Sequence, residues 1–169
     1  MKTIMVKELT PENFRPYGSF SDIARPSGLG GGIPGMKFYP DREFVELGSC
    51  HAAAISITEV TDQLKHMVVA LEQHAHCGEG MMSIDGDMLV YFAPAGLNYP
   101  QVVDFVEAFV VPRNTFVTIR PGVWHCMPFV MEGGSIHVVN VLPERTYAND
   151  TKMYVLKEEE RILISTGGC

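Results

Sequence analysis

The chain has 169 residues, of which 46% are hydrophobic, and this is enough apolar material for one domain with a buried core. Its formal net charge is -7 at pH 7 and no run of Lys and Arg offsets that balance, so we expect neither nucleic acid nor an anionic membrane as a partner. We expect residues 1–169 to form a single domain.

The first ten residues, MKTIMVKELT, lack the long apolar stretch of a signal peptide, and no apolar run approaches the roughly 20 residues that span a bilayer. These features predict a cytoplasmic protein. In that reducing compartment the four cysteines, which form no CxxC pair, should be free thiols: Cys50, Cys77, Cys126 and Cys169.

A short helix is predicted over residues 8–14, with Thr10 as its N-cap and Pro11 at the first helical position. Residues 26–36, PSGLGGGIPGM, satisfy G-x-G-x-x-G, but Pro34 lies inside the motif and neither a strand nor a helix pattern flanks it. We expect this segment to be a mobile loop over a pocket mouth or a simple connection, rather than a dinucleotide-binding turn.

From residue 52 onward the sequence consists of short β-type runs separated by turns rich in Gly, Pro, Asn and Asp. This spacing is typical of an all-β sandwich or barrel. No repeat or second zone of composition marks a domain boundary. The predicted strands lie within residues 52–60, 65–74, 80–85, 87–95, 105–111, 115–120, 135–142 and 152–157, with a further strand and a frayed end after residue 157.

The stretch HAHCGE, residues 74–79, contains the first candidate metal ligands. Alternate side chains of a strand share one face, so His74 and His76 are expected to project together. The Cys77-Gly78 step allows a tight turn, after which Glu79 could aim back at the same point. This spacing resembles the first motif of the cupin superfamily, which are small double-stranded β-helix (jelly-roll) proteins whose open end commonly holds a divalent metal.

A second group comes from RPGVWH, residues 120–125, where His125 follows a Pro-Gly turn as in the second cupin motif. A single histidine is more often a surface or hydrogen-bonded core residue than a ligand, but two motifs in one strand-rich chain favour a metal site. The predicted ligands of a divalent Mn, Fe, Ni, Co or Zn ion are His74, His76, Glu79 and His125. Coordination left open would go to water or a bidentate substrate.

Several segments, in order along the chain, resemble the ureidoglycolate lyase family, itself cupin-like: LTPENFRPYGSF near the start, ALEQH at residues 70–74, and GVWH at residues 122–125 followed by Pro128 and Phe129. The resemblance implies cleavage of ureidoglycolate to glyoxylate and urea in a jelly-roll pocket, usually in a homodimer. The site residues that it implies by position are Glu72, His74, Trp124 and His125. The chain departs from the family pattern at His76, Glu79, Cys126 and Met127, and these changes bring the site closer to a standard metal-binding cupin.

The resulting hypothesis is a metal-dependent lyase in which the metal chelates the carboxylate and α-hydroxyl of ureidoglycolate or a related small 2-hydroxy acid. Glu72 has the strand parity to share a face with His74, either as general base, as support for a ligand imidazole or as an exposed carboxylate. Trp124 should face away from His125 and pack in the core. The predicted catalytic residues are Glu72, His74 and His125.

Other interpretations are a cupin isomerase, decarboxylase or dioxygenase, or a non-catalytic module that binds a small acid. Each has a small-molecule carboxylate as its partner. Arg113 and Arg120 could steer that carboxylate, although nothing in their spacing separates them from surface residues. A homodimer could form through the apolar C-terminal strands, which could pair across an interface.

Overall fold

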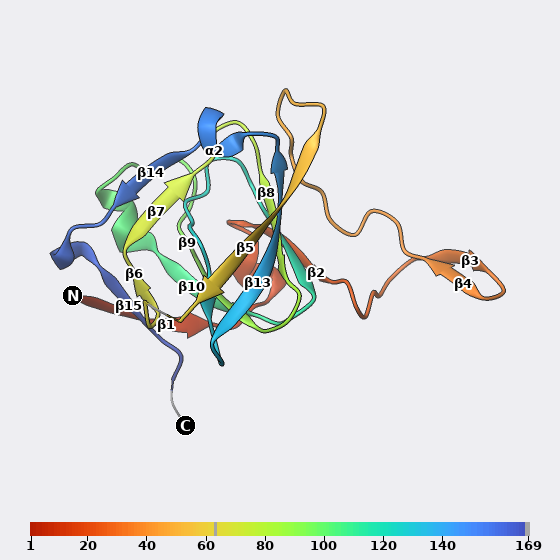
Figure 1. The fold of residues 1–169 in the computed structure, drawn as a ribbon, viewed down its shortest axis with the longest axis horizontal. Coiled ribbons are helices and arrows are strands. Elements are labelled where there is room, and N and C mark those ends of the chain that lie inside the picture. The colour runs from red at the N-terminus through yellow and green to blue at the C-terminus, as the bar shows by residue number, and fades with distance from the viewer. Residues whose placement is uncertain (63, 168–169) are drawn as a thin grey trace.

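The computed structural model describes residues 1–62 and 64–167, most of which lie in or between short strands (Figure 1). Two large sheets form the body of the molecule. The six-stranded sheet has the order β12 (Phe129–Val130), β9 (Met88–Phe92), β10 (Glu107–Val111), β1 (Lys2–Lys7), β15 (Ile162–Ser165) and β6 (Met67–Val68). The five-stranded sheet has the order β2 (Gly18–Asp22), β11 (Thr115–Ile119), β8 (Glu79–Ser83), β13 (Ser135–Pro143) and β5 (Ala53–Thr61).

Two small ribbons and a few helical turns complete the fold. One ribbon pairs β7 (Ala70–Gln73) with β14 (Lys152–Val155), and the other pairs β3 (Gly31–Ile33) with β4 (Met36–Phe38). The helical pieces are α1 (Pro11–Phe14), α2 (Thr146–Asn149) and the 3-10 turns Gln101–Phe105 and Glu158–Glu160. Among the described residues, no helix is long and apolar enough to cross a membrane.

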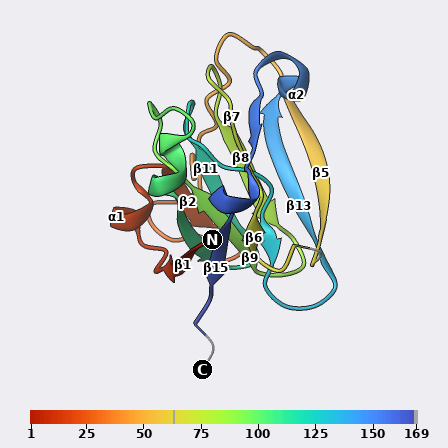
Figure 2. The ribbon, with the colours of Figure 1, turned by 90° about the vertical axis from the view of Figure 1, so that its left-hand side faces the viewer.

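The core lies on both faces of the six-stranded sheet, and β9 shows why. All five of its residues are buried. Val90 and Phe92 belong to the cluster that packs against the five-stranded sheet, whereas Leu89 and Tyr91 pack on the opposite side with Trp124. A strand covered on both faces needs such a continuous apolar run. The two sheets that face one another across this core form the jelly roll predicted from the sequence (Figure 2).

The predicted N-terminal helix is present as the single turn α1. Thr10 is its N-cap, and the Thr10 hydroxyl accepts a hydrogen bond of 3.2 Å from the Asn13 amide. The helix places Phe14, which is fully buried, edge-on against Phe92 and Phe109 at ring-centroid distances of 5.3 and 5.6 Å. The turn therefore supplies an aromatic anchor to the core between the sheets.

A Phe14→Ala variant should lower the free energy of unfolding by about 3–5 kcal/mol, because it removes a buried ring and leaves a cavity that the two sheets can only partly close. Urea unfolding followed by circular dichroism measures this loss. Phe105→Ala is the control, since Phe105 is 53% exposed, and its change should stay within about 0.5 kcal/mol. Equal changes in the two variants would contradict the anchoring role of Phe14.

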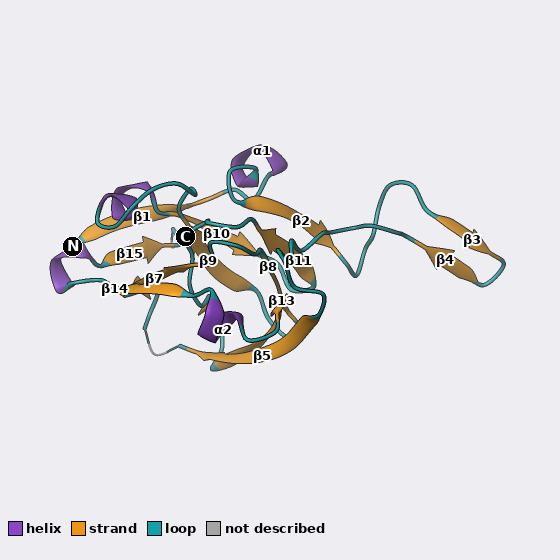
Figure 3. Ribbon diagram, turned by 90° about the horizontal axis from the view of Figure 1, so that it is seen from above, coloured by secondary structure: helices purple, strands orange, loops and turns teal. Residues whose placement is uncertain are grey.

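The strands predicted after residue 52 are present, but the N-terminal part of the chain differs from the prediction. β1 and β2 were not predicted, although β1 alternates between half-buried and exposed residues. Residues 26–36 contribute to the β3–β4 hairpin, which turns at Gly35 (φ +86) and projects away from the body (Figures 1 and 3). The expectation of a loop over the pocket mouth was wrong, because none of these residues lines the site cavity described below.

The C-terminal strands β14 and β15 differ in how much edge they leave free, and their pairing across an interface stays a prediction. β15 is predicted correctly as a strand, but it lies between β1 and β6, so neither of its edges is free. β14 has one paired edge, against β7. The described cysteines Cys50, Cys77 and Cys126 are free thiols, as predicted, and Cys169 lies outside the described residues.

Candidate metal centre

The turn between β7 and β8 positions the first two candidate ligands. β7 ends at Gln73, so His74 lies just past the strand, and Glu79 is the first residue of β8. The turn between them is tight. A side chain at Gly78 would bring its Cβ within 2.6 Å of the carbonyl oxygen of Ile119, and the Gly78 amide donates to the carbonyl of Glu46 at 2.7 Å. Only glycine fits this position without displacing backbone.

His125 reaches the same place from a distant part of the chain. Gly122, at φ +78, forms the turn that the sequence predicts, and its amide donates to the carbonyl of His74 at 2.6 Å. His125 then pairs with Glu72 in an isolated antiparallel bridge whose two N–H···O distances are 2.6 and 2.8 Å. The two cupin-like motifs are therefore joined directly by backbone hydrogen bonds.

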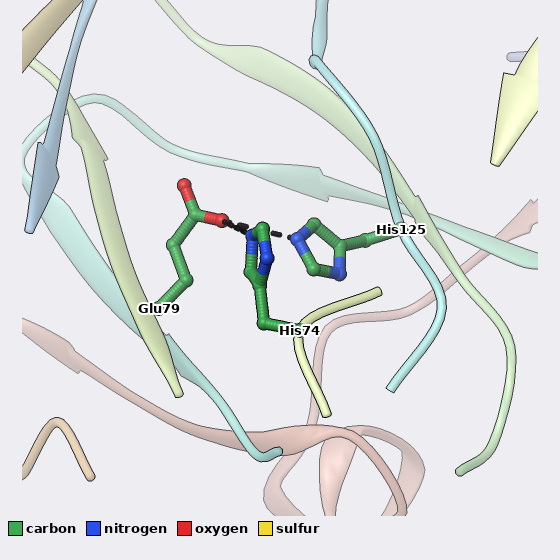
Figure 4. Close-up of side chains that lie close together, drawn as sticks. All are labelled: His74, Glu79 and His125. Atoms are coloured by element: carbon green, nitrogen blue, oxygen red, sulfur yellow. Dashed lines mark hydrogen bonds and ion pairs between the residues drawn. The ribbon is translucent and has the colours of Figure 1, made fainter. Parts of the chain in front are cut away.

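The side chains of His74, Glu79 and His125 converge in a buried cluster (Figure 4). Their exposed fractions are 6%, 6% and 2%. The Glu79 Oε2 atom lies 3.3 Å from His74 Nε2 and 3.0 Å from His125 Nε2. One ligand atom from each residue lies within 4.8 Å of the other two, which is close enough for one ion to bind all three.

Hydrogen bonds to the outer atoms of His74, His125 and Glu79 fix the orientation of each candidate ligand. His74 Nδ1 donates to the carbonyl of Asp150 at 3.0 Å, and His125 Nδ1 donates to the carbonyl of Val123 at 2.9 Å. A carbonyl oxygen only accepts, so Nδ1 carries a proton in both rings, and Nε2 is the atom that would supply a lone pair to a cation after losing its own proton to solvent. The side-chain amide of Asn140 donates a hydrogen bond of 2.7 Å to Glu79 Oε1, so Glu79 Oε2 is the oxygen that faces the imidazoles.

In this cluster Glu79 supplies a negative charge that would attract a cation, whereas the cation would have to displace a proton from His74. Burial alone would raise the pKa of the Glu79 carboxyl, but hydrogen bonds with His125 and His74 outweigh it and hold the pKa well below its usual value. Burial would lower the pKa of His74, but its hydrogen bonds with Glu79 and Asp150 raise it overall. Glu79 is thus a carboxylate, and two imidazoles with one carboxylate match the donor preferences of Mn, Fe, Co, Ni and Zn.

The three ligands form part of the wall of a cavity of about 390 Å³. Ala54, Ser56 and Thr58 of β5 line another wall. Glu72 also lines the cavity, as predicted from its strand parity. The other lining residues are Met81, Cys126, Met127, Pro128, Asn140, Leu142, Pro143, Arg145, Thr146, Tyr147, Thr151 and Met153.

Comparisons with known proteins identify the family of this chain. The family profile described as Ureidoglycolate lyase matches residues 1–163. This chain belongs to the ureidoglycolate lyase family. A relative from Agrobacterium fabrum (strain C58), named "Putative ureidoglycolate lyase", is 27% identical over 126 residues, which are 74% of each chain.

Among solved structures, a dTDP sugar isomerase from Desulfovibrio desulfuricans has a TM-score of 0.52 with 12% sequence identity, and the match covers 85% of each chain. At this identity the likeness shows the fold alone, and it confirms the cupin-type jelly roll. The ureidoglycolate lyase family chain therefore combines that fold with a buried His-Glu-His group.

The expected fourth ligand, His76, does not lie with the other three. It is exposed and is absent from both the cluster and the cavity wall. The prediction assumed that the strand continues to residue 76, but β7 ends at Gln73. The Asp150 carboxylate accepts hydrogen bonds from the amides of Ala75 (3.0 Å) and His76 (2.8 Å), so the backbone bends and the alternation of faces is lost.

The thiols beside the site are protonated. Burial raises the pKa of Cys126 to about 11, and the nearby charge of Glu72 adds to the shift. Burial also raises the pKa of Cys77 to about 11. Because a thiolate is the reactive form of cysteine, neither residue is set up as a nucleophile.

Trp124 lies in the core as predicted, where it is fully buried and its Nε1 donates to the carbonyl of Leu97 at 2.9 Å. Three residues that contact the cluster or line the cavity were not predicted: Asn140, Arg145 and Asp150. The sequence could have indicated Asn140, since it is a polar amide residue inside the apolar run of β13. Arg145 is the only Lys or Arg that lines the cavity in the described part of the chain, whereas Arg113 and Arg120 lie elsewhere.

Proposed function

We propose that this chain is a metal-dependent carbon–nitrogen lyase that acts on ureidoglycolate or a related small 2-hydroxy acid. The main support is the convergence of His74, Glu79 and His125 on the wall of a cavity large enough for such a substrate. These three residues would hold the cation. A divalent cation bound there would supply Lewis acidity to the substrate hydroxyl.

Glu72 is the proposed proton carrier. Cleavage of ureidoglycolate removes the α-hydroxyl proton as the carbonyl of glyoxylate forms. The electron pair of the breaking C–N bond leaves with the urea nitrogen, which then takes up one proton. One carboxylate can accept the first proton and deliver it to the nitrogen, so no other reactant is needed. Two observations support this role: Glu72 lines the cavity, and its backbone pairs with that of His125.

Arg145 is the proposed partner of the substrate carboxylate. Arg145 is exposed and lines the cavity, so it is accessible to a ligand that enters the cavity. Two carboxylates, Glu72 and Glu79, line the same cavity, and an anionic substrate therefore needs a compensating cation.

An Arg145→Gln variant should raise the KM for ureidoglycolate by about 10-fold or more and leave kcat within a few-fold, because the pair with the carboxylate forms in both the ground state and the transition state. Steady-state assays of urea release measure both constants. Arg113→Gln is the matched control, since Arg113 does not line the cavity. A fall in kcat at unchanged KM would assign Arg145 a different role.

Turnover before and after metal removal tests the proposed function. The protein is stripped with a chelator, dialysed, and reloaded separately with Mn, Ni and Zn, and urea and glyoxylate are then measured with ureidoglycolate as substrate. The proposal requires that stripping abolishes turnover and that at least one metal restores it. Full activity of the stripped protein, or no metal binding under any loading, would overturn the metal-dependent mechanism.

A further inference from the structure

A chain of hydrogen bonds crosses three neighbouring strands and ends at Glu79. The Thr58 hydroxyl on β5 donates to the Asn140 side-chain oxygen Oδ1 at 2.9 Å, and the Asn140 amide on β13 donates to Glu79 Oε1 at 2.7 Å. The strands β5, β13 and β8 are adjacent in the five-stranded sheet, and Glu79 begins β8. All three side chains line the cavity, so they lie on the same face of this sheet.

The register of the strands explains why these side chains meet. Asn140 lies opposite Ser56 on β5 and opposite Met81 on β8. Thr58 and Glu79 are each two residues from those partners, so both are diagonal neighbours of Asn140 on one face. Asn140 therefore joins the β5 wall of the cavity to a candidate metal ligand.

The chemistry of the three groups fixes the direction of these hydrogen bonds. Hydrogen bonds with the imidazoles hold the pKa of Glu79 well below its usual value, so both of its oxygens only accept. The Asn140 NH₂ group must therefore face Glu79, which leaves Oδ1 facing Thr58. Since Oδ1 also only accepts, the Thr58 hydroxyl is the donor. The hydroxyl thus holds the Asn140 amide in the orientation in which it binds Glu79.

The Asn140 amide leaves one oxygen of Glu79 for a cation. Figure 4 shows one carboxylate oxygen facing the two imidazoles and the other pointing away from them. A carboxylate can bind a metal through one oxygen or through both. Because Oε1 is held by Asn140, the three candidate ligands supply one donor atom each. Two imidazoles and one carboxylate used in this way leave positions on the metal open.

We propose that Asn140 and Thr58 are positioning residues that keep Glu79 a one-oxygen ligand and so preserve places for both oxygens of a chelating substrate. The carboxylate and hydroxyl oxygens of a 2-hydroxy acid would take those places. If Glu79 bound through both of its oxygens, it would occupy one of them. This inference rests on the metal binding proposed above, but not on the bond that is cleaved.

The test uses Co(II) as the metal and glycolate as the probe, because glycolate is a 2-hydroxy acid with no C–N bond to cleave. Asn140→Leu removes the amide, and Thr58→Val removes the hydroxyl at nearly constant volume. At saturating Co(II), the Kd for glycolate should rise by about 10-fold or more in Asn140→Leu and by a smaller factor in Thr58→Val. Without glycolate, the visible spectrum of each Co(II)-loaded variant should already differ from that of the parent, since it reports the ligands around the metal.

Two further variants are the controls. Thr58→Ser keeps the hydroxyl and should restore the spectrum and the glycolate affinity of the parent. Thr61→Val is the matched control, since Thr61 is also on β5 but is exposed and does not line the cavity. It should behave like the parent in both measurements. Circular dichroism checks that each variant is folded, and Thr58→Val carries the test if Asn140→Leu is not.

Three results would overturn the proposal while the metal site stands. One is parent-like spectra and glycolate affinity in both Asn140→Leu and Thr58→Val. Another is weaker glycolate binding with an unchanged Co(II) spectrum, which would mean that these side chains contact the acid directly. The third is weaker Co(II) binding with unchanged glycolate affinity at saturation, which would make Asn140 a simple support of Glu79.

The behaviour of the parent separates this inference from the proposed reaction. A parent that binds no Co(II) would overturn the metal site and this inference together. A parent that binds Co(II) and glycolate but does not cleave ureidoglycolate would overturn only the proposed reaction, and the comparison of the variants would still decide the roles of Asn140 and Thr58.

Discussion

A Glu79→Gln variant is expected to lose stoichiometric binding of divalent metal and more than about 100-fold in turnover. Removing a residue that merely supports a ligand costs about 10–100-fold in metal affinity or activity, and Glu79 would supply a ligand oxygen itself. The Glu79 side chain is buried, and its Oε2 atom lies 3.3 Å from His74 Nε2 and 3.0 Å from His125 Nε2.

The Glu79→Gln substitution should preserve the fold, which makes the result interpretable. The new side-chain amide NH₂ can donate to the Nε2 atoms of His74 and His125, and its carbonyl oxygen can still accept from Asn140. Metal content is measured by elemental analysis after loading, and thermal unfolding checks stability. His76→Ala is the control and should bind metal like the parent, because His76 is exposed and outside the cluster. Loss of metal in His76→Ala alone would restore the four-ligand site and contradict the three-ligand cluster.

The parts of the site that the sequence predicted depend on short-range rules. The Pro121-Gly122 step allows a turn three residues before His125, and the Cys77-Gly78 step allows a turn directly before Glu79, the first residue of β8. The strands after residue 52 followed from their apolar patterns in the same way. These features need no information about distant residues.

The errors have long-range causes. His76 does not share a face with His74, because its backbone amide donates to the carboxylate of Asp150, which is 74 positions away in the sequence. β1 is an N-terminal strand inserted in parallel between β10 and β15, and such a position is defined only by the assembled sheet. The glycines of residues 26–36 indicated a loop, but Gly35 allows the tight turn of a hairpin instead. Arg145 lies outside both motifs, and only the fold brings it to the cavity.

The role of Glu72 can be narrowed by the hydrogen bonds around the ligands. From the sequence, Glu72 could be a general base, a support for a ligand imidazole or an exposed carboxylate. The supporting position is already filled in both rings, since the Nδ1 atoms donate to the carbonyls of Asp150 and Val123. Glu72 is only half-buried and lines the cavity. This position supports the role proposed for Glu72, proton transfer to and from the substrate.

A Glu72→Gln variant should therefore lower kcat by about 10²–10⁴-fold, which is the usual contribution of a general acid or base. Metal content and the stability of the fold should not change, because the bridge to His125 uses only backbone atoms of residue 72. Glu59→Gln on β5 is the matched control: Glu59 is also a strand glutamate, but it is exposed and does not line the cavity. The kcat of this control should equal that of the parent.

The combination of kcat and metal content separates the three roles of Glu72. A fall in kcat with full metal content supports proton transfer, and the Glu72→Asp variant should then recover part of the rate because it keeps a carboxylate. A parallel fall in metal content would instead mean that Glu72 supports a ligand through a contact made only in the loaded site. Unchanged kcat would make Glu72 a solvated wall residue, and the proton would then have to be carried by another group in the cavity.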